Sequence, residues 1–384
     1  MCMKYSVPFL LTLLFPFVAS CASDRPLTKA EAIRKTEDVK SAWLDSIRLA
    51  TADIYNNKEL RAGDLVMPIA WQVFSDEDNT DDLALFISLH GGGGAPPRLN
   101  DQQWQNQQRL YRPRNAVYLC PRAPFNTWDL HFKPELDEFY HRIIQMAVAY
   151  LHVNPDKVYI MGYSAGGDGV WRLGPRMADS WAAASMMAGH PGDVSLVSLR
   201  NTPFMIWCGA DDAAYDRNRE CERRIAVMDS LHRDDPEGYI FEGHIVPDKG
   251  HWMDRADTAA VTWMAQYVRN PYPRRIVWQQ GDAMHEHFYW LTAPAGELAK
   301  GREVRAGIEG NTICITRCDY SSLTISLCDA MLDLDRPVTV KYRDKVLFEG
   351  RVERHAGTLR RTLATRGDLS YIFPAQLHVR IDKP

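Results

Sequence analysis

A serine at the centre of a glycine-flanked turn is the first group in this sequence that could do chemistry. Gly162, Ser164 and Gly166 fit the pattern G-x-S-x-G, and the apolar residues 158 to 161 before them predict a short buried strand. The pattern is typical of a sharp strand-to-helix turn that exposes a nucleophilic hydroxyl. Such a serine attacks the acyl carbon of an ester or amide when a general base, an orienting carboxylate and oxyanion donors lie beside it.

Candidates for the acid and the base follow this serine along the chain. The segment "WCGADDAAYD" ends an apolar run and offers three carboxylates, those of Asp211, Asp212 and Asp216. The loop "DKGHWMD" places His251 behind a glycine and just before a predicted helix, which favours it as the base. His244 alternates with strand residues in "FEGHIVP" and is interpreted as an ordinary strand side chain.

The elements that must position these groups alternate between strands and helices. Apolar strand-like runs and amphipathic segments follow one another from about residue 60 to residue 270, which predicts a mostly parallel sheet flanked by helices. Ligands of such a sheet bind beyond the carboxyl ends of its strands, where Ser164 and the aspartates would lie. A capping-box pattern, Thr28 to Glu31, predicts a helix within residues 21 to 59. The helix after Ser164 is expected to stop at Gly174 and Pro175.

The last part of the chain has a different pattern. Residues 271 to 384 contain runs such as "TICITR", "LTISLC" and "VTVKYRDKVLFEG" that alternate like strands, and no helix is predicted among them. We therefore predict a C-terminal all-β domain with a sandwich-like architecture.

Residues 60 to 268 resemble the α/β-hydrolase superfamily, and within it the secreted esterase branch of polyhydroxybutyrate-depolymerase-like, feruloyl-esterase-like and peptidase-like proteins. The resemblance is carried by "LHGGGG", "PDKVYIMGYSAGGDGVWRL", "AGHPGD", "WCGADD" and "GHW". It implies an α/β-hydrolase fold, and its G-x-x-D pattern, counted from Gly209, selects Asp212 as the acid. It also implies that the backbone N–H groups of Gly92 and Ala165 form the oxyanion hole, with His90 stabilising the glycine loop.

Aromatic residues are frequent in the loops expected around this site. They are Trp104, Trp128, Tyr163 and Trp252. Their ring faces could bind a sugar or a phenolic acyl group, although packing within the loops is the competing interpretation. Asp168 falls in the first turn of the helix after Ser164, where its charge suits the helix dipole, so a structural role is favoured for it.

The N-terminus predicts export. Lys4 precedes an apolar stretch of signal-peptide length, and residues 18 to 21, "VASC", resemble a bacterial lipobox. We therefore expect residues 1 to 20 to be a signal peptide and Cys21 to carry lipid, anchoring the protein in the bacterial cell envelope, in the periplasm or at the outer membrane. The net charge of −4 gives no electrostatic case for nucleic acid. No cofactor motif or metal-ligand spacing is found, and the expected mechanism needs neither.

Together these patterns predict an exported serine hydrolase that cleaves carboxylic esters, with acyl esters of polysaccharides as the favoured substrates. A prolyl-oligopeptidase-like peptidase would use the same groups. A catalytically silent glycan-binding lipoprotein is the alternative of a different class.

Overall fold

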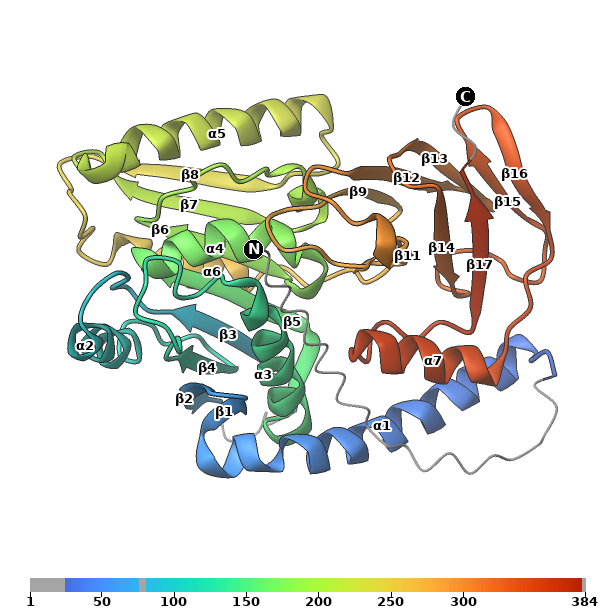
Figure 1. Cartoon of the computed structure of the whole chain (residues 1–384), viewed down its shortest axis with the longest axis horizontal. Helices are drawn as coiled ribbons and strands as arrows, with labels where there is room; N and C mark the ends of the chain where they lie inside the picture. Colours follow the sequence, from blue (N-terminus) through green and yellow to red (C-terminus); the bar gives the residue numbers. More distant parts are fainter. Residues whose placement is uncertain (1–24, 76–80, 382–384) are drawn as a thin grey trace, which may run out of the picture.

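A computed structural model describes residues 25–75 and 81–381, so Cys21 and the expected signal peptide lie outside the described residues. Its largest element is an eight-stranded sheet with the order β1-β2-β4-β3-β5-β6-β7-β8 (Figure 1). The strands are β1 (Glu59–Ala62), β2 (Leu65–Phe74), β3 (Leu83–Leu89), β4 (Ala116–Pro121), β5 (Val153–Tyr163), β6 (Ala183–Met187), β7 (Phe204–Gly209) and β8 (Phe241–Val246). Only the pairs β1–β2 and β2–β4 are antiparallel. The predicted mostly parallel sheet is confirmed.

Helices cover both faces of this sheet. They are α2 (Pro97–Gln107), α3 (Asp137–Tyr150), α4 (Ala165–Arg176), α5 (Arg217–Asp234) and α6 (Ala259–Met264). Within β3, Leu85 and Ile87 pack with α3, α4 and α5, whereas Phe86 packs in the cluster that includes α6. Successive side chains of a strand point to opposite faces, so a sheet buried on both sides needs continuous apolar runs.

The helix after Ser164 is longer than expected. α4 continues to Arg176 and contains Pro175, whereas the sequence pattern placed its end at Gly174. Proline removes the hydrogen bond that its own N–H would donate and crowds the carbonyl four residues earlier, and the helix ends one residue after Pro175. Gly174 stays helical because its bare Cα lets Phe204 approach, and a Cβ there would lie 3.0 Å from that ring.

Two further sheets follow residue 271. One has the order β10-β11-β14-β17 and the other β16-β15-β13-β12-β9. Their strands are β9 (Arg275–Gln279), β10 (His287–Phe288), β11 (Leu291–Thr292), β12 (Glu303–Glu309), β13 (Thr312–Cys318), β14 (Ser322–Leu327), β15 (Val338–Tyr342), β16 (Lys345–Gly350) and β17 (Ala375–Arg380). Buried residues of both sheets, such as Ile315 and Ile325, share one hydrophobic cluster, as in a sandwich.

Two helices connect the large sheet to the C-terminal sheets. α1 (Lys29–Asn57) begins with the predicted capping box at Thr28 and runs beneath both parts of the molecule (Figure 1). Its Trp43 and Ile47 pack with Leu359 and Leu363 of α7 (Ala356–Arg366). The sequence analysis expected no helix in this region. α7 was missed because the segment "HAGTLRRTLATRG" has two leucines among arginines and threonines, and their burial depends on the distant α1.

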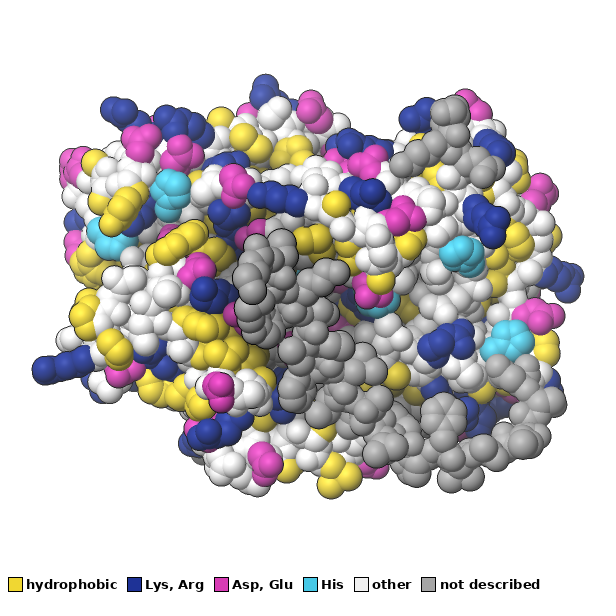
Figure 2. Space-filling model, viewed as in Figure 1, with side chains coloured by type: hydrophobic (Ala, Val, Ile, Leu, Met, Phe, Trp, Pro, Cys, Tyr) yellow, Lys and Arg dark blue, Asp and Glu magenta, His cyan; other side chains and the backbone are white. Residues whose placement is uncertain are grey.

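The surface has no dominant charge on the face seen in Figure 2, where Lys and Arg side chains are interspersed with Asp and Glu. No helix in the described ranges 25–75 and 81–381 combines the length and the apolar character needed to cross a bilayer.

Candidate active site

Ser164 lies in a strained turn between β5 and α4. Its φ of 57° and ψ of −121° are unusual for a residue with a side chain, and such strain persists only where the surroundings fix it. The Ser164 N–H donates to Met187 O (2.9 Å), and Ser164 O accepts from the N–H of Asp168 (2.9 Å). The turn therefore projects the serine hydroxyl beyond the carboxyl end of β5, as the G-x-S-x-G pattern predicted.

The two glycines of the pattern are required by close backbone contacts. A Cβ on Gly162 would lie 2.3 Å from Gly166 O, and one on Gly166 would lie 2.1 Å from Leu89 O. Because both neighbours are backbone atoms, no side-chain movement could relieve the clash.

We expect Gly162→Ala to lower the free energy of unfolding by about 3 kcal/mol or to prevent folding, because the added methyl must displace main chain in a packed core. Urea denaturation measures the loss. Gly296→Ala is the matched control, since nothing lies within 4 Å of its Cβ position, and it should change stability by less than about 0.5 kcal/mol. Equal stability of the two variants would contradict the described turn.

Three predicted residues meet at this turn. His251 Nε2 lies 2.9 Å from Ser164 Oγ, and His251 Nδ1 lies 2.8 Å from Asp212 Oδ2. Asp212 follows β7 and is buried, while His251 comes from the loop after β8 and stays partly exposed. The structure thus joins a hydroxyl, an imidazole and a carboxylate from three separated segments.

The alternatives to these residues lie elsewhere. Asp211 is exposed, and Asp216 is half-buried and pairs with Arg219 and Arg223. His244 is a strand side chain of β8, as its sequence position indicated. Its ring stacks on that of Trp207, with 4.0 Å between the ring centroids.

The electrostatics of the group favour an ionised Asp212. Burial by itself would raise the pKa of this carboxyl, but the hydrogen bond and charge of His251, with the charge of Arg217, lower the pKa below its ordinary value. An anionic Asp212 accepts a hydrogen bond from the N–H at His251 Nδ1, which leaves the lone pair on Nε2 free to accept the Ser164 proton.

Arg217 is a member of the site that the sequence analysis missed. Its Nη1 donates to Asp212 Oδ1 (2.7 Å) and lies 3.2 Å from His251 Nδ1. Two residues in left-handed conformation, Tyr215 (φ 58°) and Asp216 (φ 57°), come directly before it and turn α5 so that its first side chain reaches back to the acid. No motif marks this position, and an arginine at a helix start has no sequence signal of its own.

We expect Arg217→Met to lower kcat about tenfold with KM little changed, because a charge-assisted hydrogen bond that orients Asp212 is lost. Addition of guanidinium chloride at millimolar concentration should restore part of kcat in this variant only. Arg219→Met removes an exposed arginine two residues away and is the control. If KM rose while kcat stayed constant, Arg217 would bind substrate rather than position the acid.

The glycine loop after β3 lies against the serine. A Cβ on Gly91 would be 3.4 Å from Ser164 Cβ, and Gly92 and Gly93 have φ of 116° and 106°, which only glycine adopts readily. Buried Asn100 fixes the loop by accepting from Gly93 N–H (3.0 Å) and donating to Gly93 O (3.1 Å). The amide of Ala165 is at the first position of α4, where N–H groups have no partner within the helix.

His90 stabilises this loop, in agreement with its expected role. Its Nδ1 donates to Gly91 O (2.6 Å), and its Nε2 accepts from the N–H of Ala123 (3.2 Å), which fixes one neutral tautomer. Burial lowers the pKa of His90 to about 4, so the ring is uncharged at neutral pH.

The four predicted substrate-binding aromatics fall into two groups. Trp128 and Trp252 are 62% and 48% exposed; Trp128 adjoins Gly93, and Trp252 follows His251. Tyr163 is buried, and its hydroxyl donates to His251 O (2.7 Å), so it supports the loop that holds the base. Trp104 is partly buried in α2 and donates to Cys120 O (2.9 Å). Of these four, only Trp128, beside the glycine loop, and Trp252, next to His251, therefore present open ring surface near the site.

Asp168 holds a neighbouring loop. Its Oδ1 accepts from the N–H of His190 (2.6 Å), and burial raises its pKa to about 6. This contact is a structural one, as the sequence position suggested. Among the residues that the structure describes, no cluster of three or more His, Cys, Asp or Glu is placed to hold a metal ion.

Comparison with known proteins gives structural similarity without sequence similarity. No family model and no curated protein matches the chain. A thermostable esterase is similar over 55% of this chain and 62% of its own, with 19% identity and a TM-score of 0.41. The fluorophosphonate-binding serine hydrolase FphF of Staphylococcus aureus is similar over 54% of this chain and 96% of its own, with 14% identity and a TM-score of 0.37. A ferulic acid esterase is similar over 52% of this chain and 97% of its own, with 15% identity and a TM-score of 0.34. The chain thus spans under two thirds of the first of these proteins.

Proposed function

We propose that this protein is a serine hydrolase that cleaves carboxylic esters. The observation that carries the proposal is the hydrogen-bonded line from Ser164 Oγ through His251 to Asp212, with steps of 2.9 and 2.8 Å. These distances are within the reach that proton transfer requires. The line lies beside a glycine loop at the carboxyl end of a parallel sheet, where such folds bind ligands.

The proposed reaction has two halves. Ser164 Oγ attacks the acyl carbon while His251 Nε2 accepts its proton, and the carbonyl oxygen becomes an oxyanion that accepts hydrogen bonds from the amides of Gly92 and Ala165. The carbon–oxygen bond to the alcohol then breaks, and His251 returns the proton to the leaving alcohol. Water, deprotonated by His251, attacks the acyl-serine, and collapse of this second intermediate releases the acid and restores Ser164.

A substrate panel tests this proposal. We expect measurable hydrolysis of p-nitrophenyl acetate, with weaker or no release of p-nitroaniline from aminoacyl anilides. Hydrolysis of the anilides alone would favour a peptidase. No hydrolysis of any compound, by a protein shown to be folded by circular dichroism, would favour the silent glycan-binding alternative.

Acyl esters of polysaccharides are the substrates we favour, because two exposed indole rings lie on segments next to the glycine loop and His251. Apolar ring surface that stays exposed at a site is suited to stacking on a sugar or a phenolic acyl group.

We expect Trp128→Ala to lower kcat/KM for methyl ferulate about three- to tenfold, since an aromatic contact contributes about 0.5–1.5 kcal/mol beyond burial. The value for p-nitrophenyl acetate should stay within about twofold, because its acyl group is too small to reach the ring. Leu49→Ala, which removes an 84% exposed side chain from α1, is the control. Equal losses on both esters would argue for damage to the glycine loop instead.

We further propose export and lipidation at Cys21, supported by the lipobox-like "VASC". Labelled palmitate should be incorporated into the protein in bacterial cells and should be absent from Cys21→Ser. Incorporation into both proteins would place the lipid at another residue.

A further inference from the structure

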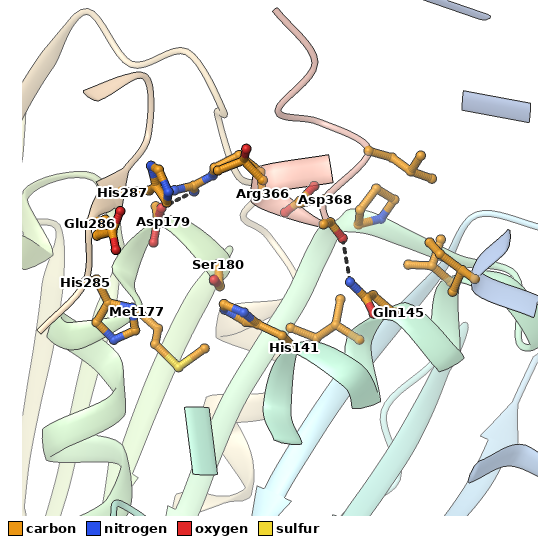
Figure 3. A pocket seen from close by; sticks show the side chains of 17 residues that line it. His141, Gln145, Met177, Asp179, Ser180, His285, Glu286, His287, Arg366 and Asp368 are labelled. Carbon is orange, nitrogen blue, oxygen red and sulfur yellow. Dashed lines mark hydrogen bonds and ion pairs between the residues drawn. The ribbon is translucent and has the colours of Figure 1, made fainter. Parts of the chain in front are cut away.

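A second cavity lies at the opposite ends of the strands from Ser164. It contains about 830 Å³ of empty space, part of which is open solvent, and reaches Pro155 near the start of β5, whereas Ser164 follows the end of that strand. The two residues are nine positions apart along the strand, which corresponds to roughly 30 Å. The cavity is bounded by α1, α3 and the end of α7, and by residues 285 to 287 before and within β10 (Figure 3). It is therefore a site separate from the candidate active site.

The cavity has one apolar and one polar wall. The apolar wall consists of Ile47, Ile144, Val148, Pro155 and Leu369. The polar wall includes His141, Gln145, Ser180, His285 and His287. Figure 3 shows His141, Ser180 and His285 gathered at one side of the cavity. A ligand that fits must offer both an apolar surface and several hydrogen-bonding groups.

The charges around the cavity are largely paired within the protein. Asp179 forms an ion pair with Arg366, and Asp368 pairs with Arg269 at 2.7 Å. His285 Nε2 lies 2.9 Å from Asp137, which in turn pairs with Arg176. Glu286, which is exposed, and Glu138, whose charge acts on His141, add negative charge near the cavity. The cavity thus has no excess of positive charge to attract an anion.

His141 and His287 do not supply that charge either. Burial lowers the pKa of His287 to about 4 and also lowers the pKa of His141. Neutral imidazoles offer one donor and one acceptor each, as a hydroxyl group does. His287 Nδ1 is hydrogen-bonded to Thr292 Oγ1 (2.9 Å), so Nε2 is the ring nitrogen that a ligand could use.

We propose that this cavity binds a neutral polyhydroxylated compound of about monosaccharide size. Its C–H face would lie on the aliphatic wall, and its hydroxyls would bond to His141, Ser180 and His287. His141, Ser180 and His287 are half-buried, and a ring of hydroxyls supplies donors and acceptors in the mixture that imidazoles and a serine require. This proposal does not depend on the hydrolytic activity, because none of these residues contacts Ser164, His251 or Asp212.

Binding of sugars to Ser164→Ala protein tests the proposal without turnover. We expect saturable binding of D-glucose or D-xylose by saturation-transfer NMR, at least tenfold weaker binding of D-glucuronate, and at least fivefold weaker binding of the neutral sugar after His141→Ala or Ser180→Ala. His152→Ala, which removes an exposed histidine, and Trp128→Ala, at the active site, should bind as the parent does.

Three results would overturn the proposal. The first is no saturable binding of either neutral sugar, which would leave a water-filled cavity. The second is binding that is lost in Trp128→Ala but kept in His141→Ala and Ser180→Ala, which would place the sugar at the active site. The third is tighter binding of D-glucuronate than of glucose. None of these results would affect the proposed hydrolysis, which is measured on Ser164-containing protein.

Discussion

Replacement of Ser164 with alanine is expected to lower kcat for p-nitrophenyl acetate by on the order of 10⁵-fold, with KM nearly unchanged. The hydroxyl is the only group in the proposed reaction that forms a bond to substrate, and loss of such a nucleophile costs nearly as much as loss of the whole catalytic group. The small residual rate would come from the oxyanion donors and substrate binding. Single-turnover kinetics with p-nitrophenyl acetate measure the loss without interference from product release.

A serine that does not contact His251 is the matched control for this variant. Ser180→Ala removes a hydroxyl of the same kind from the opposite ends of the strands and should keep kcat within about twofold. The melting temperatures of the two variants should lie close to that of the parent, because neither Oγ is needed for packing. Substantial activity in Ser164→Ala would exclude Ser164 as the nucleophile.

Replacement of Asp212 with asparagine is expected to lower kcat by on the order of 10⁴-fold. Arg217 Nη1 lies 2.7 Å from Asp212 Oδ1 and can only donate, so the new side chain must turn its carbonyl oxygen toward Arg217. Its NH₂ group then faces His251 Nδ1, which has to accept a hydrogen bond. The proton moves to Nε2, and the ring can no longer accept the proton of Ser164.

The adjacent Asp211 offers a control, because the same change from aspartate to asparagine is made one position earlier in the chain. Asp211 is exposed and accepts no hydrogen bond from His251, whose Nδ1 bonds to Asp212 instead. Asp211→Asn should therefore keep kcat within about twofold. If Asp211→Asn were the inactive variant, the acid would have been assigned to the wrong residue.

Stability should also depend on Asp212. The pKa of this carboxyl is lowered on folding, so the stabilisation it supplies is complete above its ordinary value of 3.8 and is lost as the pH falls through the lowered pKa. The stability difference between the parent and Asp212→Asn, measured by urea denaturation, should therefore shrink below about pH 4.

Local patterns were sufficient to predict the large sheet and the position of the serine. The buried strands are continuous apolar runs, and Gly162 and Gly166 form a recognisable motif because a Cβ on either would lie only 2.3 or 2.1 Å from a backbone oxygen. α7 escaped prediction because its burial depends on α1, some three hundred residues earlier in the chain. Pro175 was taken as a helix stop, but the helix continues through it and ends one residue later, at Arg176.

The site was predictable to the extent that chain order and loop position determine it. Asp212 and His251 follow successive strands of the sheet, so their meeting with Ser164 follows from the topology. Arg217 and Asn100 could not be identified in this way, because each acts through the three-dimensional position of a loop. Tyr163 is in the turn as predicted, but its hydroxyl points to His251 O rather than to open solvent. The second cavity joins residues of α1, α3, α7 and β10, and no local pattern indicates such a meeting.

The proposal depends above all on a serine whose oxygen is activated by its neighbours, and covalent labelling measures this directly. Incubation with a fluorophosphonate probe, followed by peptide mapping, should place one phosphonyl group on Ser164, with labelling lost in Ser164→Ala and slowed in Asp212→Asn. A folded, unlabelled parent protein, or a label on any other residue, would contradict the account.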